Sequence, residues 1–238
     1  ATIYAGGKHL FRSRDRGTSW EDLGDMTTGV DRATLPLMGK MPDENILSID
    51  DGVPYYPGVT VIAESPRRKG LLYVGTDDGR LRMSSDEGKT WTDLQDRLPG
   101  LPKSSWFGGI EASRHSDATL YVAVDNHRSN DLKNYVYKSA DGGKTFTSIT
   151  GDLPADRVVR TVREDTKNPN VLYLGTEFGL CYTWNGGANW QRIFDFGNDT
   201  TQYLFLTPNS GGGLRFAIKN GGGEQIVERA GALASGSW

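Results

Sequence analysis

The chain is poor in the side chains from which disulfides and metal sites are built. Its 238 residues include one cysteine, Cys181, and three scattered histidines, His9, His115 and His127. A single thiol cannot form an internal disulfide, and isolated histidines lack the spacing of zinc ligands. We therefore expect no disulfide framework, no metal site and no cofactor.

Long apolar runs and an excess of basic charge are also missing. No stretch approaches the roughly 20 apolar residues that cross a bilayer, so no membrane span is expected. Lysine and arginine number 27 against 30 aspartates and glutamates, a formal net charge of −3. Proteins that bind nucleic acids normally carry a basic patch, and none is evident, which argues against a DNA or RNA partner.

Glycine, by contrast, is abundant. The 31 glycines and 10 prolines follow no three-residue period and suit many short strands joined by tight turns. A hydrophobic content of 36% is sufficient for a packed core in a chain of this length. These features predict an all-β fold with little helix.

A motif of the form Ser-x-Asp-x-Gly-x-x-aromatic occurs three times, and a fourth, degenerate copy spans residues 183–190. Its key positions are Ser13, Asp15, Gly17 and Trp20; Ser84, Asp86, Gly88 and Trp91; Ser139, Asp141, Gly143 and Phe146; and Gly187 and Trp190. In a tight turn, Ser and Asp side chains bond backbone N–H groups, Gly takes a positive φ, and an aromatic ring covers the base of the hairpin. We predict a structural role for all of these residues.

A strand of similar sequence precedes each copy. These strands are Leu72–Thr76, Leu120–Val124, Leu172–Thr176 and, more loosely, Ile3–Gly7. The repeating unit is strand, turn, strand, motif turn, strand, and the last two motifs are separated by about one propeller blade, roughly 40 to 50 residues. The earlier gaps contain insertions at residues 38–57 and 125–131, and inserted loop tips are where binding surfaces usually lie.

These motifs and strands make residues 1–192 resemble the Asp-box, or bacterial neuraminidase repeat, β-propellers of the sortilin-like and bacterial "glycosyl hydrolase" group. The resemblance implies propeller blades, of which about four are visible, in a closed or an incomplete propeller. It also implies an extracellular or periplasmic location. An open arc of blades leaves strand edges unpaired and favours an oligomer. A sorting-receptor role does not carry over, because one cysteine cannot supply the cysteine-rich module of sortilins.

The pattern changes near residue 192. Tyr203–Pro208 and Leu214–Ile218 are predicted to be two strands joined by a glycine-rich connection. They resemble the opening strands of a laminin-G or concanavalin-like jelly roll, a fold that needs about eight strands. We therefore predict a second region, 193–238, that is either a truncated jelly-roll segment or a set of strands that complete the propeller or pack on its rim.

Catalytic residues cannot be assigned from the sequence. Sialidases share Asp boxes, but their Arg-Ile-Pro signature is absent, which argues against that activity. A glycoside hydrolase of the xyloglucanase-like propeller type needs only two suitably placed carboxylates. The carboxylates available for this role are Asp50, Asp51, Glu64, Asp77, Asp78, Glu111, Asp125 and Glu177. We interpret Asp77 and Asp78 first as turn residues, because an Asp-Gly turn follows the strand there.

Candidate ligand contacts lie in the insertions and beside them. They are Tyr55, Tyr56, Trp106, His127 and Arg128. Aromatic rings stack on sugars, although Trp106 and Phe107 are better explained as core residues. His127 and Arg128 share a polar tip with Asp131, where a His–carboxylate pair can move protons, and a solvated, salt-bridged loop is the plainer alternative.

The first function predicted is a non-catalytic propeller module that binds a protein or a glycan through its loop tips. One alternative is a carbohydrate-active propeller, either a glycoside hydrolase or a sugar binder, with carboxylates and aromatics in a cleft. Another is a fragment or composite without independent function.

Overall fold

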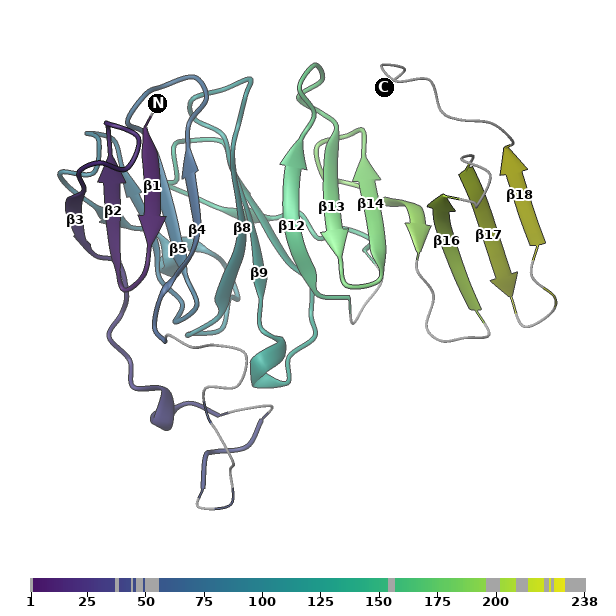
Figure 1. Cartoon of the computed structure of the whole chain (residues 1–238), viewed down its shortest axis with the longest axis horizontal. Coiled ribbons are helices and arrows are strands. Elements are labelled where there is room, and N and C mark those ends of the chain that lie inside the picture. The colour runs from purple at the N-terminus through teal and green to yellow at the C-terminus, as the bar shows by residue number, and fades with distance from the viewer. Residues whose placement is uncertain are drawn as a thin grey trace. The chain divides into compact units, whose positions relative to one another are not determined.

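The computed structural model describes residues 2–36, 39–43, 45, 49, 56–153, 157–195, 202–208, 214–220, 223 and 225–229. Tyr55 lies outside these residues. As predicted, the described structure is nearly all β, with five sheets and three short 3-10 helices (Figure 1). None of the helices in the described ranges has the length and apolar character of a membrane span.

The chain divides into two compact units, one of residues 1–177 and 182–191 and the other of 178–181 and 192–238. The first sheet is formed by β1 (Ile3–Gly6), β2 (His9–Ser13) and β3 (Glu21–Asp25). The second is formed by β4 (Val59–Glu64), β5 (Leu72–Thr76), β6 (Leu81–Ser84) and β7 (Thr92–Asp93). The third is formed by β8 (Trp106–Ala112), β9 (Leu120–Asp125), β10 (Tyr135–Ser139) and β11 (Thr147–Ser148). The fourth is formed by β12 (Val159–Glu164), β13 (Leu172–Thr176), β14 (Gly179–Thr183) and β15 (Gln191–Asp195).

Each of these sheets is a meander in which the strands pair in chain order, the arrangement of a propeller blade. The 3-10 helices lie in the connections: η1 (Arg32–Thr34), η2 (Gln95–Arg97) and η3 (His127–Ser129). The predicted boundary at residue 192 between two domains stays a prediction.

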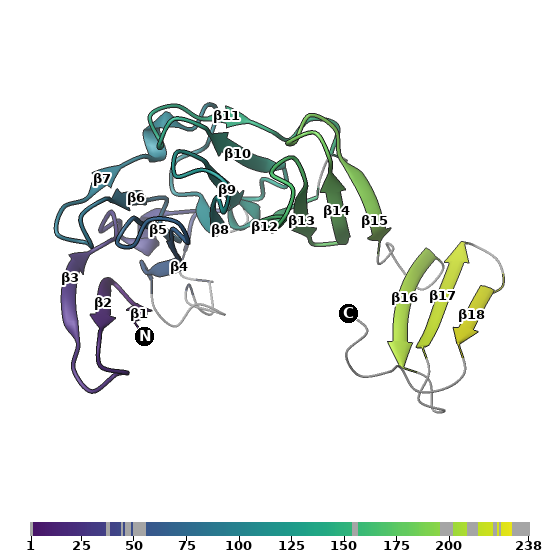
Figure 2. The same ribbon diagram turned by 90° about the horizontal axis from the view of Figure 1, so that it is seen from above.

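The first strand of a blade packs beside the first two strands of the blade before it. β8 lies beside β4 and β5, and β12 lies beside β8 and β9 (Figure 2). This close packing of the blades explains the glycine in the Leu-Tyr-Val-Gly-Thr strand. A Cβ on Gly75 would lie 2.5 Å from the Cβ of Phe107 in the next blade. A larger side chain at position 75 would push the two blades apart.

The main apolar core lies between the second and third sheets. It includes the buried side chains Tyr73, Leu81, Leu94, Phe107, Ile110, Val122, Val124 and Tyr137. Phe107 is fully buried, as predicted, whereas its neighbour Trp106 is only half-buried. The two aromatics therefore differ in role, because consecutive residues of a strand point to opposite faces.

Each Asp box closes a turn between the last two strands of its blade. The Ser84 hydroxyl donates to Asp86 Oδ1 at 2.8 Å and accepts from the Gly88 N–H at 2.8 Å. Asp86 also accepts the Thr90 N–H at 2.9 Å and the Thr90 hydroxyl at 2.6 Å. The boxes that begin at residues 13 and 139 contain the same four bonds.

The degenerate box keeps this pattern with uncharged groups. The Thr183 hydroxyl donates to Asn185 Oδ1 at 2.7 Å, and Asn185 Oδ1 accepts the Asn189 N–H at 3.0 Å. Thr183 and Asn185 thus occupy the places of Ser and Asp, so the turn geometry does not depend on a charge.

Box residues also pack on the preceding blade. The Trp91 ring N–H donates to the Leu23 carbonyl at 3.3 Å, and a Cβ on Gly88 would lie 2.9 Å from Leu23 Cδ1. The same relation joins Gly143 to Leu94 and Gly187 to Ile149, at 3.1 and 2.8 Å. In each pair the aliphatic residue comes three positions after the aromatic of the previous box.

Trp20 departs from the prediction that every box aromatic covers a hairpin base. Its side chain is 46% exposed, whereas Phe146 and Trp190 are each 6% exposed. Later box aromatics contact the preceding sheet or the residue that follows it: Trp91 donates to the Leu23 carbonyl, Phe146 shares a core with Leu94, and Trp190 donates to the Ile149 carbonyl. The described residues contain no sheet before β1–β3, whose Asp box includes Trp20.

The second unit contains a three-stranded antiparallel sheet formed by β16 (Gln202–Pro208), β17 (Leu214–Asn220) and β18 (Gln225–Arg229). The sequence predicted only the first two of these strands. β18 was missed because its five residues contain a single apolar pair, Ile226 and Val227, next to glycines. The jelly-roll resemblance of this region stays a prediction.

Candidate functional site

Two cavities lie at the end of the blades opposite the Asp boxes. In a meander of four strands, the second strand ends at the end of the blade where the first and third strands begin. The Asp-box turn, which follows the third strand, lies at the opposite end. The loops that follow β3, β5 and β9 and the loop that precedes β8 therefore meet at one end. Their residues form both cavities.

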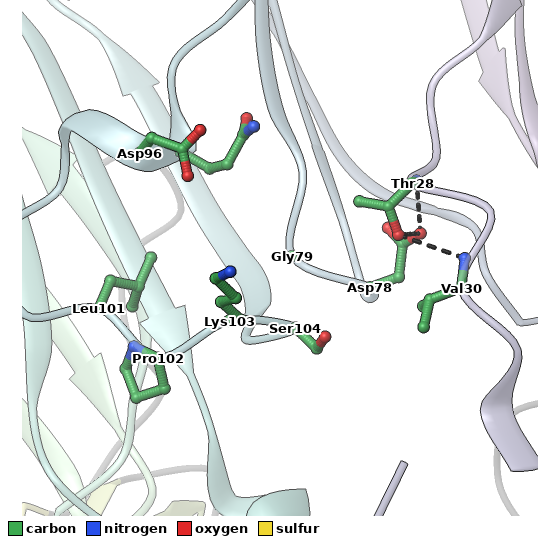
Figure 3. Close-up of a pocket in the computed structure, with 10 residues that line it drawn as sticks. Thr28, Val30, Asp78, Gly79, Asp96, Leu101, Pro102, Lys103 and Ser104 are labelled. Carbon is green, nitrogen blue, oxygen red and sulfur yellow. Dashed lines mark hydrogen bonds between the residues drawn. The ribbon is translucent and has the colours of Figure 1, made fainter. Parts of the chain in front are cut away.

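The larger cavity has a volume of about 440 Å³ (Figure 3). It is lined by Thr28, Val30, Asp78, Gly79, Gln95, Asp96, Leu101, Pro102, Lys103 and Ser104. Asp78 is 1% exposed and accepts the Thr28 N–H at 2.6 Å, the Thr28 hydroxyl at 2.7 Å and the Thr76 hydroxyl at 2.5 Å. The two bonds from Thr28 tie the loop after β3 to the turn after β5, and the bond from Thr76 closes that turn, which supports the interpretation of Asp78 as a turn residue.

The smaller cavity has a volume of about 270 Å³ and shares Lys103 and Ser104 with the larger one. It is lined by Arg32, Leu35, Pro36, Tyr56, Asp77, Lys103, Ser104, Arg128 and Ser129. Gly79 has φ 93°, and a Cβ there would lie 2.6 Å from the Ser104 backbone nitrogen. The turn at residues 77–79 and the segment at 103–104 are therefore in contact where the two cavities adjoin.

Asp77 has a different environment from that of its neighbour Asp78. Its carboxylate, 7% exposed, accepts the Gly58 N–H at 2.7 Å. Burial raises the pKa of Asp77 above its usual value, and the charge of Asp78 adds to this effect. Asp77 is thus a buried acid in a cavity wall with an enhanced tendency to hold a proton.

Two arginines that line the smaller cavity each contact an aromatic ring. The Arg32 guanidinium lies 4.9 Å from the centre of the Tyr56 ring, and that of Arg128 lies 3.9 Å from the centre of the Trp106 ring. Burial lowers the pKa of Arg128, and the charge of Arg32 lowers it further. Both guanidinium groups are held in place by cation–π contacts.

An ion-paired cluster occupies the same end of the blades. Asp125, 4% exposed, accepts the His127 N–H at 2.9 Å and lies 2.7 Å from His127 Nδ1. Arg160 bonds Asp125 and reaches Glu177 at 3.3 Å. Among the described residues, no group of three or more His, Cys, Asp or Glu side chains is arranged to hold a metal ion.

Asp131 is not the carboxylate that pairs with His127, contrary to the expectation for the loop tip. Asp131 accepts the Tyr135 hydroxyl at 2.7 Å and the Asn126 amide at 3.0 Å, which holds it at the base of β10. The 3-10 turn η3 instead turns His127 back onto Asp125, the last residue of β9.

The structure brings together some of the predicted ligand contacts. Tyr56 and Arg128 line the smaller cavity, Trp106 supports the Arg128 guanidinium, and His127 belongs to the ion-paired cluster. Tyr55 lies outside the described residues. Sequence reasoning missed Arg32 and Lys103, which belong to no motif. The strand order could have identified them, because it places the loops that hold Arg32 and Lys103 at the same end of the blades as the insertions at residues 38–57 and 125–131.

The repeats and the meander sheets define this chain as an Asp-box β-propeller chain. Residues 10–23 match the family model of the BNR-Asp box repeat. The chain is similar to solved propellers: it superposes on the crystal structure of an ancestral GH74 enzyme with a TM-score of 0.58 and 20% identity, covering 91% of this chain and 26% of that one. This likeness shows the fold.

Two curated proteins are related in sequence. A xyloglucanase of Hypocrea jecorina is 25% identical over 179 residues, which cover 69% of this chain and 20% of that protein. An oligoxyloglucan-reducing end-specific xyloglucanase of Emericella nidulans is 29% identical over 126 residues, which cover 52% and 15%. The chain thus spans about a fifth or less of their lengths. These relatives favour the carbohydrate-active alternative over the non-catalytic module that was predicted first.

Proposed function

We propose that the chain is part of a carbohydrate-active propeller whose loop end binds a glucan chain of the xyloglucan type. The observation that carries this proposal is the sequence similarity to two xyloglucanases. Two adjoining cavities with hydroxyl, carboxylate and ammonium groups beside Leu101, Pro102 and Tyr56 support it. Such a lining suits a sugar, because the polar groups bond hydroxyls and the apolar surfaces contact ring faces.

The proposal includes the site of action. A polysaccharide that lies outside the cell does not cross the membrane, so a protein that acts on such a polymer works outside the cell. We therefore propose an extracellular location and a carbohydrate partner.

Calorimetric titration with xyloglucan oligosaccharides tests the proposed binding. Tyr56→Ala removes a ring from the wall of the smaller cavity, and we expect affinity to fall about tenfold, equivalent to ~1.4 kcal/mol. Trp184→Ala is the matched control, because Trp184 is an aromatic, 50% exposed, in the degenerate Asp box at the other end of the blades. Absence of binding by the unmodified chain at millimolar oligosaccharide would overturn the proposal.

Hydrolysis is a second candidate function, favoured by the raised pKa of Asp77 in the cavity wall. Glycosidases need a carboxyl group that gives a proton to the leaving oxygen, and burial, which favours the protonated form, suits that role. Asp77→Asn is expected to lower the release of reducing ends at least ~100-fold while oligosaccharide binding remains. If the unmodified chain releases no reducing ends from xyloglucan, the chain binds without hydrolysis.

A further inference from the structure

Two polar atoms in the wall of the smaller cavity are buried without a hydrogen-bond partner. They are the Tyr56 hydroxyl and the Arg128 Nη1 atom, and neither bonds a group in the part of the chain that the structure describes. Buried polar atoms of folded proteins are almost always bonded, so each exception calls for an explanation. A ligand that binds in the cavity would supply the missing bonds.

The Tyr56 hydroxyl is suited to bonding an uncharged ligand. Burial raises the pKa of Tyr56, and the charges of Asp78 and Asp77 raise it further, so the hydroxyl keeps its proton at neutral pH. A neutral hydroxyl both donates and accepts. Tyr56 can therefore bond either an oxygen or a hydroxyl of a ligand.

The Arg128 guanidinium is held in position without a ligand. It lies 3.9 Å from the centre of the Trp106 ring, a contact that restricts its orientation. Because its Nη1 atom and the Tyr56 hydroxyl are already shielded from water, bonds to a ligand require little further loss of hydration at these atoms. Binding therefore gains both bonds at a small desolvation cost.

The size of the cavity limits what it can hold. Its volume of about 270 Å³ lies below the roughly 300 to 1,000 Å³ of sites for drug-sized molecules. The space suits one small polar unit, and a monosaccharide unit offers several hydroxyl oxygens at that size. The Asp77 carboxyl in the same wall adds an acceptor for sugar hydroxyls.

We infer that the smaller cavity is a subsite for a single neutral sugar residue. The oxygens of that residue bond the Tyr56 hydroxyl and the Arg128 Nη1 atom after a small rotation of these side chains toward the cavity. The larger cavity beside it contacts the continuing glycan chain. This inference rests on the proposed function in taking the ligand to be a glycan, and it names the atoms that hold one sugar unit.

Tyr56→Phe tests the inference, because it removes the hydroxyl and keeps the ring. Calorimetric titration of the full chain with xyloglucan oligosaccharides measures the effect, and we expect affinity to fall about fivefold, as for the loss of one hydrogen bond. Arg128→Lys keeps the charge but loses the planar donors. We expect this variant to bind about tenfold more weakly.

Thermal melting without ligand separates this binding role from a structural one. Tyr56→Phe should melt at the same or a higher temperature, because the hydroxyl that it removes has no bond in the described structure. Tyr137→Phe is the matched control: the Tyr137 hydroxyl donates to the Pro99 carbonyl at 3.1 Å, so this variant should melt lower and bind unchanged. Arg68→Lys is the control for Arg128→Lys, since the exposed Arg68 bonds the Ser85 carbonyl in an Asp box.

Two results would overturn the inference alone. One is oligosaccharide binding that Tyr56→Phe and Arg128→Lys leave unchanged. The other is a lower melting temperature for Tyr56→Phe, which would show that the hydroxyl is bonded within the chain. If the unmodified chain binds no oligosaccharide at millimolar concentration, the proposed function and the inference are both wrong.

Discussion

At the scale of single residues, adjacent side chains of one type have different environments. Asp77 and Asp78 follow the same strand, yet Asp78 receives three hydrogen bonds from Thr28 and Thr76, whereas Asp77 receives one from Gly58. The sequence predicted the same role, that of a turn residue, for both aspartates. Their roles diverge because one carboxylate faces the loop after β3 and the other faces the smaller cavity.

The raised pKa of Asp77 predicts how stability depends on pH. The folded protein disfavours the charged form, so this residue's favourable contribution is present at pH values below its unfolded pKa and is lost as pH rises through its higher folded pKa. Asp77→Asn keeps an oxygen for the Gly58 N–H and carries no charge. We expect this variant to be more stable than the unmodified chain at pH 7, with the difference shrinking toward pH 4.

Urea unfolding at the two pH values measures this effect. Asp117→Asn is the control, since the side chain of Asp117 is 53% exposed and pairs only with Arg67 in the described structure. A lower unfolding midpoint for Asp77→Asn at pH 7 would show that the charge of Asp77 stabilises the fold.

At the scale of the element, each blade is anchored to the one before it through its Asp box. The repeated contacts of Leu23 with Gly88, Leu94 with Gly143 and Ile149 with Gly187 explain why the glycine and an aliphatic residue recur at fixed spacing. The glycine accommodates positive φ and also leaves room for the neighbouring side chain.

Two tryptophans at equivalent box positions should therefore respond differently to truncation. Trp190 is 6% exposed and donates to the Ile149 carbonyl at 2.7 Å, so Trp190→Ala is expected to cost about 3 kcal/mol of unfolding free energy. Trp20 is 46% exposed, and Trp20→Ala should change that free energy by less than ~0.5 kcal/mol. Denaturant unfolding followed by circular dichroism distinguishes the two, and equal losses would contradict the role assigned to the preceding blade.

At the scale of the whole molecule, the structural turns and the cavities occupy opposite ends of the blades. The Asp boxes lie at one end, and the cavity residues come from the loops at the other. This separation lets the loops vary in length and sequence while the repeats hold the blades. Box variants should therefore alter stability without altering glycan binding.

The charged boxes predict a shared response to acid. Hydrogen bonds from Ser19 and Thr90 lower the pKa of Asp15 and of Asp86 to about 2, and Thr145 lowers that of Asp141 in the same way. Their stabilising contribution is present above the ordinary pKa of 3.8 and is lost as pH falls toward about 2.

We expect the triple variant D15N/D86N/D141N to lose less stability than the unmodified chain between pH 4 and pH 2. Asn185→Asp is the reciprocal variant, because it gives the degenerate box the aspartate that it lacks. It should make stability more dependent on pH in this range. Unfolding midpoints measured across the range decide the matter, and parallel curves for all three proteins would contradict the prediction.

The sequence by itself determined the repeats and the all-β fold. An Asp box closes on itself within eight residues, and a strand's alternation is local, so both can be recognised without knowing what lies beside them. This local reasoning did not predict β18, the exposure of Trp20 or the partner of Asp131. Each of these features depends on a neighbouring strand, blade or turn.

Only the tertiary structure decided the candidate site. The residues of the smaller cavity come from four loops: Arg32 and Tyr56 share the connection between β3 and β4, and Asp77, Lys103 and Arg128 each belong to another. They become neighbours when the blades stack, so no simple spacing in the chain relates them. The Nη1 atom of Arg128 lacks a hydrogen-bond partner among the described residues for the same reason: whether a buried donor finds an acceptor depends on packing between loops that are distant in sequence. Local hydrogen bonds therefore determined the repeat, and long-range packing determined the cavity.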